Sequence, residues 1–360
     1  MQPEIRAWCT AAILFSNLAP AAAREPDPAV AVRRIAAGSC IRQDKPQPIW
    51  RAVAEFAPDV LLMLGDNIYG DTEDMAVLQE KYGVLAADPG FAALRSRVPI
   101  MAVWDDHDYG ANDAGRDYPR RRESQQVFLD FFGVAADSPL RSQEGIYRAL
   151  IVGPPNRRVQ FICLDTRFHR SPLVSIPRSE RVRGEGPYKP TGDPDANVLG
   201  AEQWRWLEGV LAEPAEVRIV LSSIQVAATE HRWEQWGNFP AERARLFRTL
   251  RESGARGIVV VSGDRHSAEI SRVAAGPEAL PYPLYDLTAS SLNQPQGSGK
   301  REEPNAHRLG PRFRDPNFGT LEIDWDAPAG ATMTLAIRDL TGAVVHAEQV
   351  RIADLGPAAP

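Results

Sequence analysis

Five short polar segments of the sequence carry side chains that bind metal ions. Each combines Gly, Ser or Trp with Asp, His, Cys, Tyr or Gln, and the segments are Gly38–Cys40, Gly65–Tyr69, Trp104–Asp108, Ser222–Gln225 and Ser262–His266. Carboxylates and a phenolate are hard oxygen donors that suit Ca²⁺, Mn²⁺ or Mg²⁺, whereas the thiolate of Cys40 also accepts zinc or iron. A carboxylate such as that of Asp66 is able to bridge two cations about 3.5–4 Å apart. Together the segments predict a pair of metal ions.

Each segment taken singly also has a structural interpretation. Asp66 fits a turn closed by its own side chain, Cys40 fits a small buried side chain, and His266 fits a core histidine. The segment around His107 is harder to explain in this way. Three of the four residues in Asp105–Asp108 are carboxylates, which repel one another unless a cation or a basic group offsets them. All five segments in one chain favour the metal site.

Strand-like apolar runs precede the polar segments. They are Val32–Ala37, Val60–Leu64, Val98–Trp104, Val217–Ser222 and Gly257–Ser262, and helical patterns alternate with them. In α/β sheets, ligands bind beyond the carboxyl ends of the strands. The order of the runs therefore allows the polar segments to converge on one site.

The remaining patterns complete a layered α/β fold. Helices are expected at Pro46–Phe56, Glu73–Ala86, Arg121–Phe132, Ala201–Leu211 and Ala241–Glu252. A hairpin is expected at Ile146–Val152 and Val159–Leu164, a strand at Tyr285–Ala289, and only strands from Phe318 to Ile352. We predict a four-layer α/β/β/α sandwich, completed by the C-terminal strands, as a single domain over residues 24–360. Residues 165–199 and 290–316 are expected to be long polar loops.

Composition and charge exclude several classes of protein. The 360 residues are 44% hydrophobic and 24% charged, which excludes wholesale disorder and allows a sizeable core. A formal net charge of −6 argues against nucleic-acid binding through bulk charge. No apolar run is long enough for stable membrane insertion. Three cysteines are too few for a disulfide scaffold, although a bond between Cys40 and Cys163 stays open and would contradict a metal role for Cys40.

Residues 1–23 have the layout of a secretory signal peptide. Arg6 precedes the apolar run Ala7–Leu18, and Ala21–Ala23 offers a small-residue cleavage site. Glu4 and the polar pair within the run leave a disordered or helical extension as the alternative. We predict a periplasmic or secreted protein.

The motifs resemble those of the PhoD-like (alkaline phosphatase D) family of metallophosphoesterases. They are GSC at 38–40, LGDNIYGD at 64–71, WDDHDYGAND at 104–113, LDTR at 164–167 and SGDRHSAEIS at 262–271. The resemblance implies the metallophosphoesterase sandwich and two metal ions. A first ion, Fe³⁺, would be held by Cys40, Asp66, Tyr69 and His266. A second, Ca²⁺, would be held by Asp66, Asp106 and Asp264, with Gln225 as a weaker candidate.

Two of these positions depart from the common metallophosphoesterase pattern. That pattern has Asn where Asp106 stands and His where Asp264 stands. Both changes follow the PhoD-like variant and favour hard cations, and Mn²⁺, Mg²⁺ or Zn²⁺ would also suit the donors.

The implied reaction is hydrolysis of phosphodiesters or phosphomonoesters by a metal-activated hydroxide. His107 follows a ligand position and would protonate the leaving alkoxide as general acid. Asp108 either orients His107 or is a solvated loop acid. Arg167 either clamps the phosphate through its guanidinium fork or pairs with a neighbouring acid. Trp233 and Trp236 lie in a loop, where they pack or line a pocket.

Two other functions fit the same fold. One is a phospholipase acting on lipid head groups, and the other is a non-catalytic protein that binds phosphate or metal. The sequence has no basic amphipathic helix that marks a membrane-binding surface, which disfavours the phospholipase. The expected partner is a small-molecule or polymeric phosphoester, and the sequence does not specify an oligomeric state.

Overall fold

The computed structural model describes residues 24–297 and 301–356 of the chain. The first β-sheet is built on three parallel strands. These strands are nearly continuous apolar runs with both faces covered: β1 (Arg34–Gly38), β2 (Val60–Leu64) and β3 (Ile100–Val103). Three antiparallel strands extend the sheet from β1: β13 (Asn317–Asp324), β14 (Thr332–Asp339) and β15 (Val344–Arg351). The order is β15-β14-β13-β1-β2-β3. The predicted signal peptide, residues 1–23, lies outside the described residues.

The second sheet has seven strands in the order β12-β10-β11-β9-β8-β5-β4. Its parallel core consists of β5 (Val159–Cys163), β8 (Val217–Ser222), β9 (Ile258–Ser262) and β11 (Leu284–Ala289). Its antiparallel margins are β4 (Arg148–Val152), β10 (Ala268–Val273) and β12 (Arg308–Phe313). The predicted hairpin is the pair β4 and β5.

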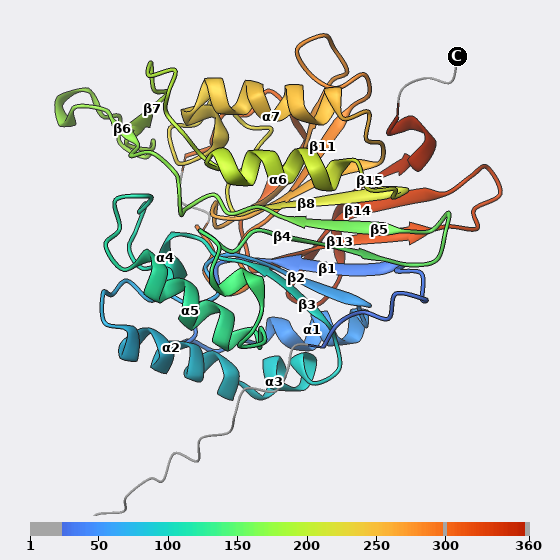
Figure 1. Cartoon of the computed structure of the whole chain (residues 1–360), viewed down its shortest axis with the longest axis horizontal. Coiled ribbons are helices and arrows are strands. Elements are labelled where there is room, and N and C mark those ends of the chain that lie inside the picture. The colour runs from blue at the N-terminus through green and yellow to red at the C-terminus, as the bar shows by residue number, and fades with distance from the viewer. Residues whose placement is uncertain (1–23, 298–300, 357–360) are drawn as a thin grey trace, which may run out of the picture.

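Helices cover the outer face of each sheet (Figure 1). The first sheet is covered by α1 (Ile49–Phe56), α2 (Met75–Ala87), α3 (Pro89–Arg95) and α5 (Arg121–Phe131). The second is covered by α6 (Ala201–Leu211) and α7 (Pro240–Glu252). A side chain caps the start of α2, where the carboxylate of Asp74 accepts the backbone N–H of Ala76 at 2.9 Å.

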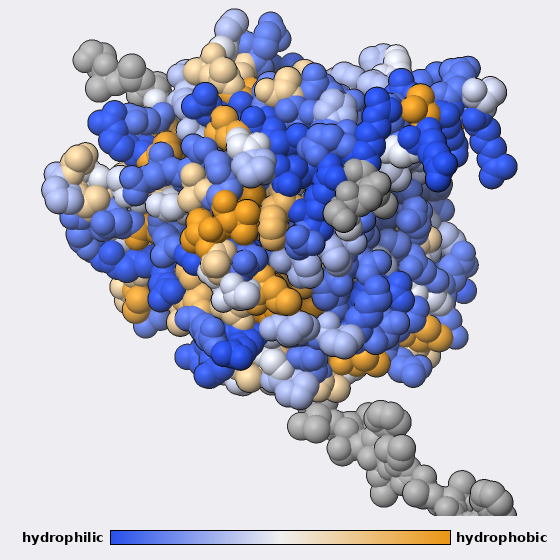
Figure 2. Space-filling model, turned by 180° about the vertical axis from the view of Figure 1, so that it is seen from behind, coloured by the Kyte–Doolittle hydropathy of each residue, from blue (hydrophilic) through white to orange (hydrophobic). Residues whose placement is uncertain are grey.

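The inner faces of the two sheets form the core. Strand β2 contacts β8, β3 contacts β5, and β13 contacts β11 across the interface. The predicted four-layer sandwich is therefore confirmed. Seen from behind, most of the surface is hydrophilic, with separate apolar patches (Figure 2). None of the helices among the described residues is long and apolar enough to cross a membrane.

Three parts of the fold differ from the prediction. The expected loop 165–199 contains a short hairpin of β6 (Val174–Ser175) and β7 (Tyr188–Lys189), and the expected loop 290–316 contains β12. Strand β10 was not expected because its sequence, AEISRV, places Glu269 and Ser271 at buried positions. Burial of these polar residues removes the apolar pattern on which strand prediction depends.

Candidate metal centre

The carboxyl ends of β1, β2, β3 and β9 converge at one end of the sandwich. A β-bridge between Ser39 and Ser290 joins the two sheets there. The backbone N–H of Ile41 donates to the carbonyl of Asp66 at 3.0 Å, which holds the segment after β1 against the segment after β2. The fifth polar segment reaches the same site through Ser223, whose hydroxyl donates to Oδ1 of Asp105 at 2.5 Å, so all five segments meet there, as the strand order predicts.

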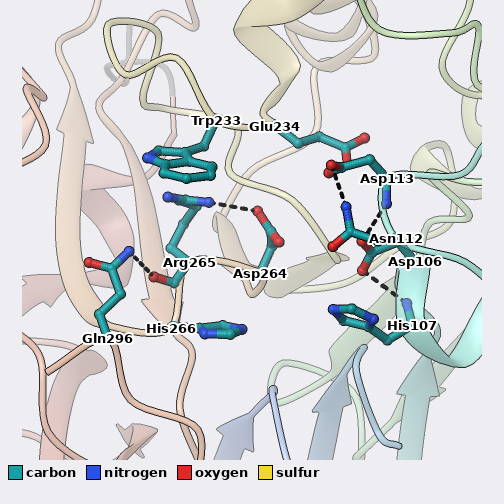
Figure 3. A pocket seen from close by; sticks show the side chains of 10 residues that line it. All are labelled: Asp106, His107, Asn112, Asp113, Trp233, Glu234, Asp264, Arg265, His266 and Gln296. Carbon is teal, nitrogen blue, oxygen red and sulfur yellow. Dashed lines mark hydrogen bonds and ion pairs between the residues drawn. The ribbon is translucent and has the colours of Figure 1, made fainter. Parts of the chain in front are cut away.

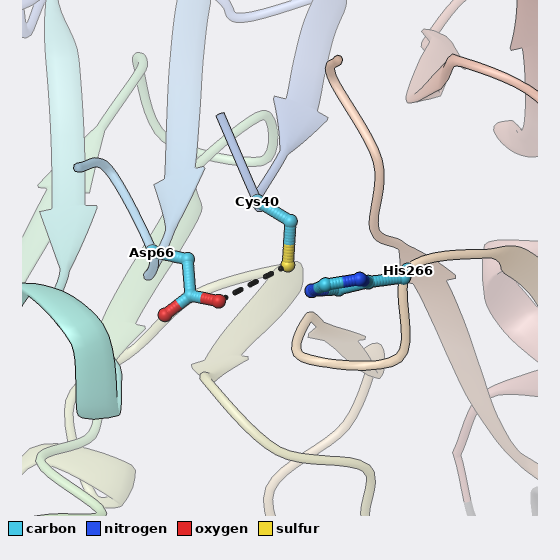
Figure 4. A group of neighbouring side chains, drawn as sticks. All are labelled: Cys40, Asp66 and His266. Atoms are coloured by element: carbon cyan, nitrogen blue, oxygen red, sulfur yellow. Dashed lines mark hydrogen bonds between the residues drawn. The ribbon is translucent and has the colours of Figure 1, made fainter. Parts of the chain in front are cut away.

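The first group of candidate ligands is Cys40, Asp66 and His266, drawn from both sheets (Figure 4). The thiol Sγ of Cys40 lies 3.3 Å from Oδ2 of Asp66. The hydroxyl of Tyr69 lies 3.0 Å from Nε2 of His266, so the phenol reaches the same group. The structure thus brings together all four residues that the resemblance assigns to the first metal.

Two further groups adjoin the first. They are Asp66, Asp106 and His107, and Asp105, Asp106 and Asp264, and within each group one ligand atom per residue lies within 4.8 Å of the others. Asp66 belongs to the first two groups and Asp106 to the last two. This sharing links the groups into one continuous cluster. Asp105 was not among the predicted ligands, although it stands beside Asp106 in the WDDHD motif.

Several candidate ligands adopt left-handed backbone conformations. The φ angles are 57° at Cys40, 48° at Asp66, 65° at Asp264 and 52° at His266. Non-glycine residues rarely adopt this region, and such conformations gather at functional sites. The backbone turns sharply at the end of each strand, which directs the side chains into the shared space.

The electrostatics of the cluster fit metal binding. Burial, reinforced by neighbouring carboxylates, raises the pKa of the Cys40 thiol and of the Asp66 carboxyl. Burial likewise raises the pKa of Asp264 to about 6. Oδ2 of Asp105 is buried without a hydrogen-bond partner among the described residues. Cations placed among these donors would offset the repulsion and satisfy that oxygen, so the residues fit a metal pair.

His107 stands beside the cluster and is held by a residue that the sequence interpretation missed. Its Nδ1 lies 2.7 Å from Oδ1 of Asp71, and its ring stacks beside that of Tyr69, with centroids 4.2 Å apart. Burial lowers the pKa of His107, but Asp106, Asp66 and Asp71 outweigh it and raise that pKa to about 11. Asp71 ends the LGDNIYGD motif, so its place in that motif was the available signal.

Asp108 does not orient His107, and it is not solvated. Its carboxylate is fully buried and accepts the backbone N–H groups of Asp105 at 2.6 Å and of Asp66 at 3.2 Å. The side-chain amide of Asn67 also donates to it at 2.5 Å. Both interpretations of Asp108 made from the sequence are thus wrong. It binds the segment after β2 to the segment after β3.

Arg167 forms buried ion pairs instead of a phosphate clamp. Its side chain is 0% exposed, its Nε donates to Oδ1 of Asp105 at 2.6 Å, and its Nη1 lies 2.7 Å from Oε2 of Glu234. With these partners the guanidinium has no open face for a substrate. The clamp is therefore corrected to the alternative, an ion pair with neighbouring acids.

Gln225 lies apart from the three ligand groups. Its amide nitrogen donates to Glu269 at 2.7 Å and to Thr288 at 2.8 Å, and its oxygen lies 2.8 Å from Nε2 of His231. These contacts occupy both ends of the amide, so we leave Gln225 out of the proposed ligand set. Cys40 and Cys163 are both free thiols, which excludes the disulfide left open above.

A cavity of about 170 Å³ lies over the cluster, and we call it the metal pocket (Figure 3). It is lined by Asp106, His107, Asn112, Asp113, Trp233, Glu234, Asp264, Arg265, His266 and Gln296. Trp236, in contrast, is 0% exposed and packs in the core. The sequence left both packing and pocket lining open for Trp233 and Trp236. In the structure Trp233 lines the metal pocket, whereas Trp236 packs in the core.

Comparison with known proteins agrees with this geometry. Residues 35–318 match the family model of the PhoD-like phosphatases. The chain is 22% identical over 267 residues to alkaline phosphatase D of Bacillus subtilis (strain 168), a match that covers 62% of this chain and 44% of that protein. The chain thus spans less than half the length of this relative.

Two solved structures share the fold. A structure of PhoD superposes with a TM-score of 0.67 at 19% identity, covering 90% of this chain and 73% of that one. A purple acid phosphatase from yellow lupin (Lupinus luteus) seeds superposes with a TM-score of 0.58 at 12% identity, covering 91% of this chain and 55% of that one. Since the family model covers most of the chain, the chain belongs to the PhoD-like phosphatase family.

Proposed function

We propose that the protein is a metal-dependent phosphoester hydrolase that acts on phosphodiesters, phosphomonoesters or both. The observation that carries the proposal is the continuous cluster, in which Asp66 and Asp106 are each shared between two ligand groups beside His107. Shared carboxylates are the arrangement that two adjacent cations need. Membership of a phosphatase family supports the same reaction.

Each candidate ligand has a place in the proposed metal pair. Cys40, Asp66, Tyr69 and His266 would hold one ion, which we propose to be Fe³⁺ because a thiolate and a phenolate both bind it. Asp66, Asp106 and Asp264 would hold the other, which we propose to be Ca²⁺, with Asp105 as a further oxygen donor. When bound, the ions would activate a water for attack and neutralise the charge of the phosphate.

The protein's own residues supply the proton for the leaving group. Asp71 binds Nδ1 of His107, which leaves Nε2 of the imidazole as the nitrogen available to a substrate. The carboxylate of Asp71, which lies outside the proposed ligand set, raises the pKa of His107 and so favours its protonated, acidic form. His107 lines the metal pocket and is thus able to donate its proton to the leaving alkoxide.

Two further parts of the proposal concern the substrate and the place of action. We propose a small-molecule or polymeric phosphoester as the substrate, because the metal pocket lies beside the candidate metal ligands of a chain that belongs to a phosphatase family. Export to the periplasm or the medium stays a proposal that depends on residues 1–23.

The test compares the wild type with Asp66→Asn on bis(p-nitrophenyl) phosphate and p-nitrophenyl phosphate, with iron and calcium content measured on the same samples. We expect Asp66→Asn to lower kcat/KM at least about 100-fold and to lower the metal content, because the shared carboxylate is lost. The control is Asp74→Asn, since Asn caps a helix as well as Asp does. Wild type that contains both metals and hydrolyses neither substrate would contradict the proposal.

A further inference from the structure

The metal pocket adjoins two other cavities on different sides. It shares His107 and Asn112 with a cavity of about 530 Å³, the acid-side cavity, lined also by Asp71, Thr72, Glu73, Gly110 and Ala111. It shares Trp233 with a cavity of about 190 Å³, the indole-side cavity, lined also by Gly184, Glu185, Gly186, Glu230, His231, Arg232, Glu302, Glu303 and Pro304. Trp233 and His107 lie at opposite ends of the metal pocket, with Asp264 between them (Figure 3).

The position of His107 gives the two cavities different roles. A general acid has to lie within hydrogen-bond reach of the leaving oxygen. The leaving group therefore lies on the side of His107, toward the acid-side cavity. A second substituent that stays on the phosphorus needs another exit, and the indole-side cavity lies at the opposite end.

Trp233 stands at this exit in a fixed position. The guanidinium of Arg265 lies over its ring, 5.2 Å from the centroid, and its backbone N–H donates to Nδ1 of His231 at 3.2 Å. Arg265 is itself held by Glu303 at 2.8 Å and by Asp264 at 3.2 Å. A side chain locked in this way loses little conformational entropy when it binds a ligand.

Trp233 differs chemically from the other residues that line the metal pocket and the indole-side cavity. Among the described residues that line the metal pocket and the indole-side cavity, Trp233 is the one Trp, Tyr or Phe. Three of the four acids that line the indole-side cavity form ion pairs: Glu303 binds Arg265, Glu302 binds Arg308, and Glu185 binds Arg301. Arg265 covers the face of the indole that is turned toward Asp264 (Figure 3), and because Trp233 is only partly buried, a ligand would stack on the part of the ring that Arg265 leaves open.

We propose that Trp233 binds the non-leaving substituent of a phosphodiester and selects flat, aromatic substituents by stacking. The proposal rests on the phosphoester hydrolysis proposed above and adds a specificity-determining residue to it. An aromatic contact of this kind stabilises the bound state enough to change kcat/KM about 10-fold. Under this proposal, the favoured substrates are phosphodiesters whose non-leaving substituent carries an aryl group or a nucleobase.

The test keeps the leaving group constant and varies only the second substituent. Bis(p-nitrophenyl) phosphate, methyl p-nitrophenyl phosphate and p-nitrophenyl phosphate all release p-nitrophenolate. We expect the metal-loaded wild type to prefer the aryl diester to the methyl diester. In Trp233→Ala that ratio of kcat/KM values falls about 10-fold, and Trp233→Phe restores most of it. The control is Trp206→Ala, since Trp206 lies on the outer helix α6, where it contacts Tyr147, and is outside both cavities.

A binding measurement separates recognition from turnover. Diphenylphosphinate and dimethylphosphinate carry no ester bond, so calorimetry reports their affinity alone. Trp233→Ala should lose the preference for the diphenyl compound. Equal ratios in wild type and Trp233→Ala, in either measurement, would overturn the role of Trp233 while hydrolysis by the wild type still stands. Wild type that hydrolyses none of the three esters would instead refute the proposed function, and the phosphinate affinities would still decide the role of Trp233.

Discussion

At the scale of single residues, the contact between Asp71 and His107 places a carboxylate outside the proposed ligand set against the proposed general acid. The carboxylate of Asp71 lies 2.7 Å from Nδ1 of His107, and its side chain is 43% exposed, so it is free of the core. Its effect on activity therefore acts mainly through His107. In the proposed mechanism Asp71 is a positioning residue, and His107 would contact the leaving group.

We expect Asp71→Ala to slow release of poor leaving groups more than release of good ones. Phenolate needs a proton more than p-nitrophenolate does, so general-acid catalysis matters more for phenyl esters. His107→Gln should lower kcat for phenyl esters about 10²–10⁴-fold, the usual contribution of such an acid. Asp71→Ala should lower kcat for phenyl esters about 10-fold. For p-nitrophenyl esters, both substitutions should lower kcat by a smaller factor.

The control for this prediction is Glu73→Ala. Glu73 lines the same acid-side cavity but is not the partner of Nδ1. A loss of equal size on both classes of ester in Asp71→Ala would show that Asp71 acts on the metals or on folding, and not on proton donation.

Residue types and strand order predicted that the polar segments converge, and the family resemblance supplied the individual ligands, but neither predicted the partners of the charged groups. Cys40, Asp66, Asp106, Asp264 and His266 converge because they follow parallel strands. Which carboxylate binds an imidazole or a guanidinium depends on how neighbouring segments pack, and a single sequence does not encode that in its spacing. For this reason Asp71 was missed, and Arg167 and Asp108 were given roles in catalysis that their burial rules out.

At the scale of elements, the segments after β2 and β3 interlock closely. Gly65 has a φ of 97°, and a Cβ placed there would lie 2.5 Å from Cβ of Asp105 and 2.8 Å from its backbone nitrogen. The carboxylate of Asp108 binds backbone N–H groups from both segments. The positions of Asp66 and Asp106 therefore depend on each other through the backbone.

We expect Gly65→Ala to destabilise the fold and to weaken metal binding, because the methyl group would push the two segments apart. The free energy of unfolding should fall by about 1–3 kcal/mol, the range for overpacking and for strain of this kind. Gly209→Ala is the matched control, since Gly209 lies within α6 with open space around it. Alanine there should stabilise the helix by about 0.5–1 kcal/mol. Urea unfolding of both variants measures the difference, and equal effects would contradict the interlocking.

The elements themselves were predicted where burial on both faces makes a run continuously apolar. β2 and β8 have the predicted bounds for this reason. β10 was missed because Glu269 is buried in a network with Arg308, Gln225 and Asn305, which satisfies its charge inside the sheet. Tertiary partners of this kind permit polar residues in a buried strand, and local patterns do not show them.

At the scale of the whole molecule, the candidate ligands come from both sheets. Cys40, Asp66 and Asp106 follow strands of the first sheet, whereas Asp264 and His266 follow β9 of the second. Bound cations would therefore connect the two halves of the sandwich at one end. The segments that bound cations would join also carry carboxylates that repel one another, because Asp66 and Asp105 are buried beside other carboxylates.

Removal of metal should therefore destabilise the entire fold and not only the site. A ligand that binds only the folded state stabilises it by RT ln(1 + [L]/Kd), about 2.7 kcal/mol at a free concentration 100 times Kd. We expect a chelator to lower the Tm of the purified protein by several degrees, and added iron and calcium to restore it. Asp66→Asn should respond weakly to the chelator, because the carboxylate shared between two ligand groups is missing, whereas Asp74→Asn should respond like the wild type. A wild-type Tm that does not change when metal analysis shows complete removal would contradict this coupling. In that case the hydrophobic contacts between β2 and β8 and between β3 and β5 would hold the sheets together without help from the metal centre.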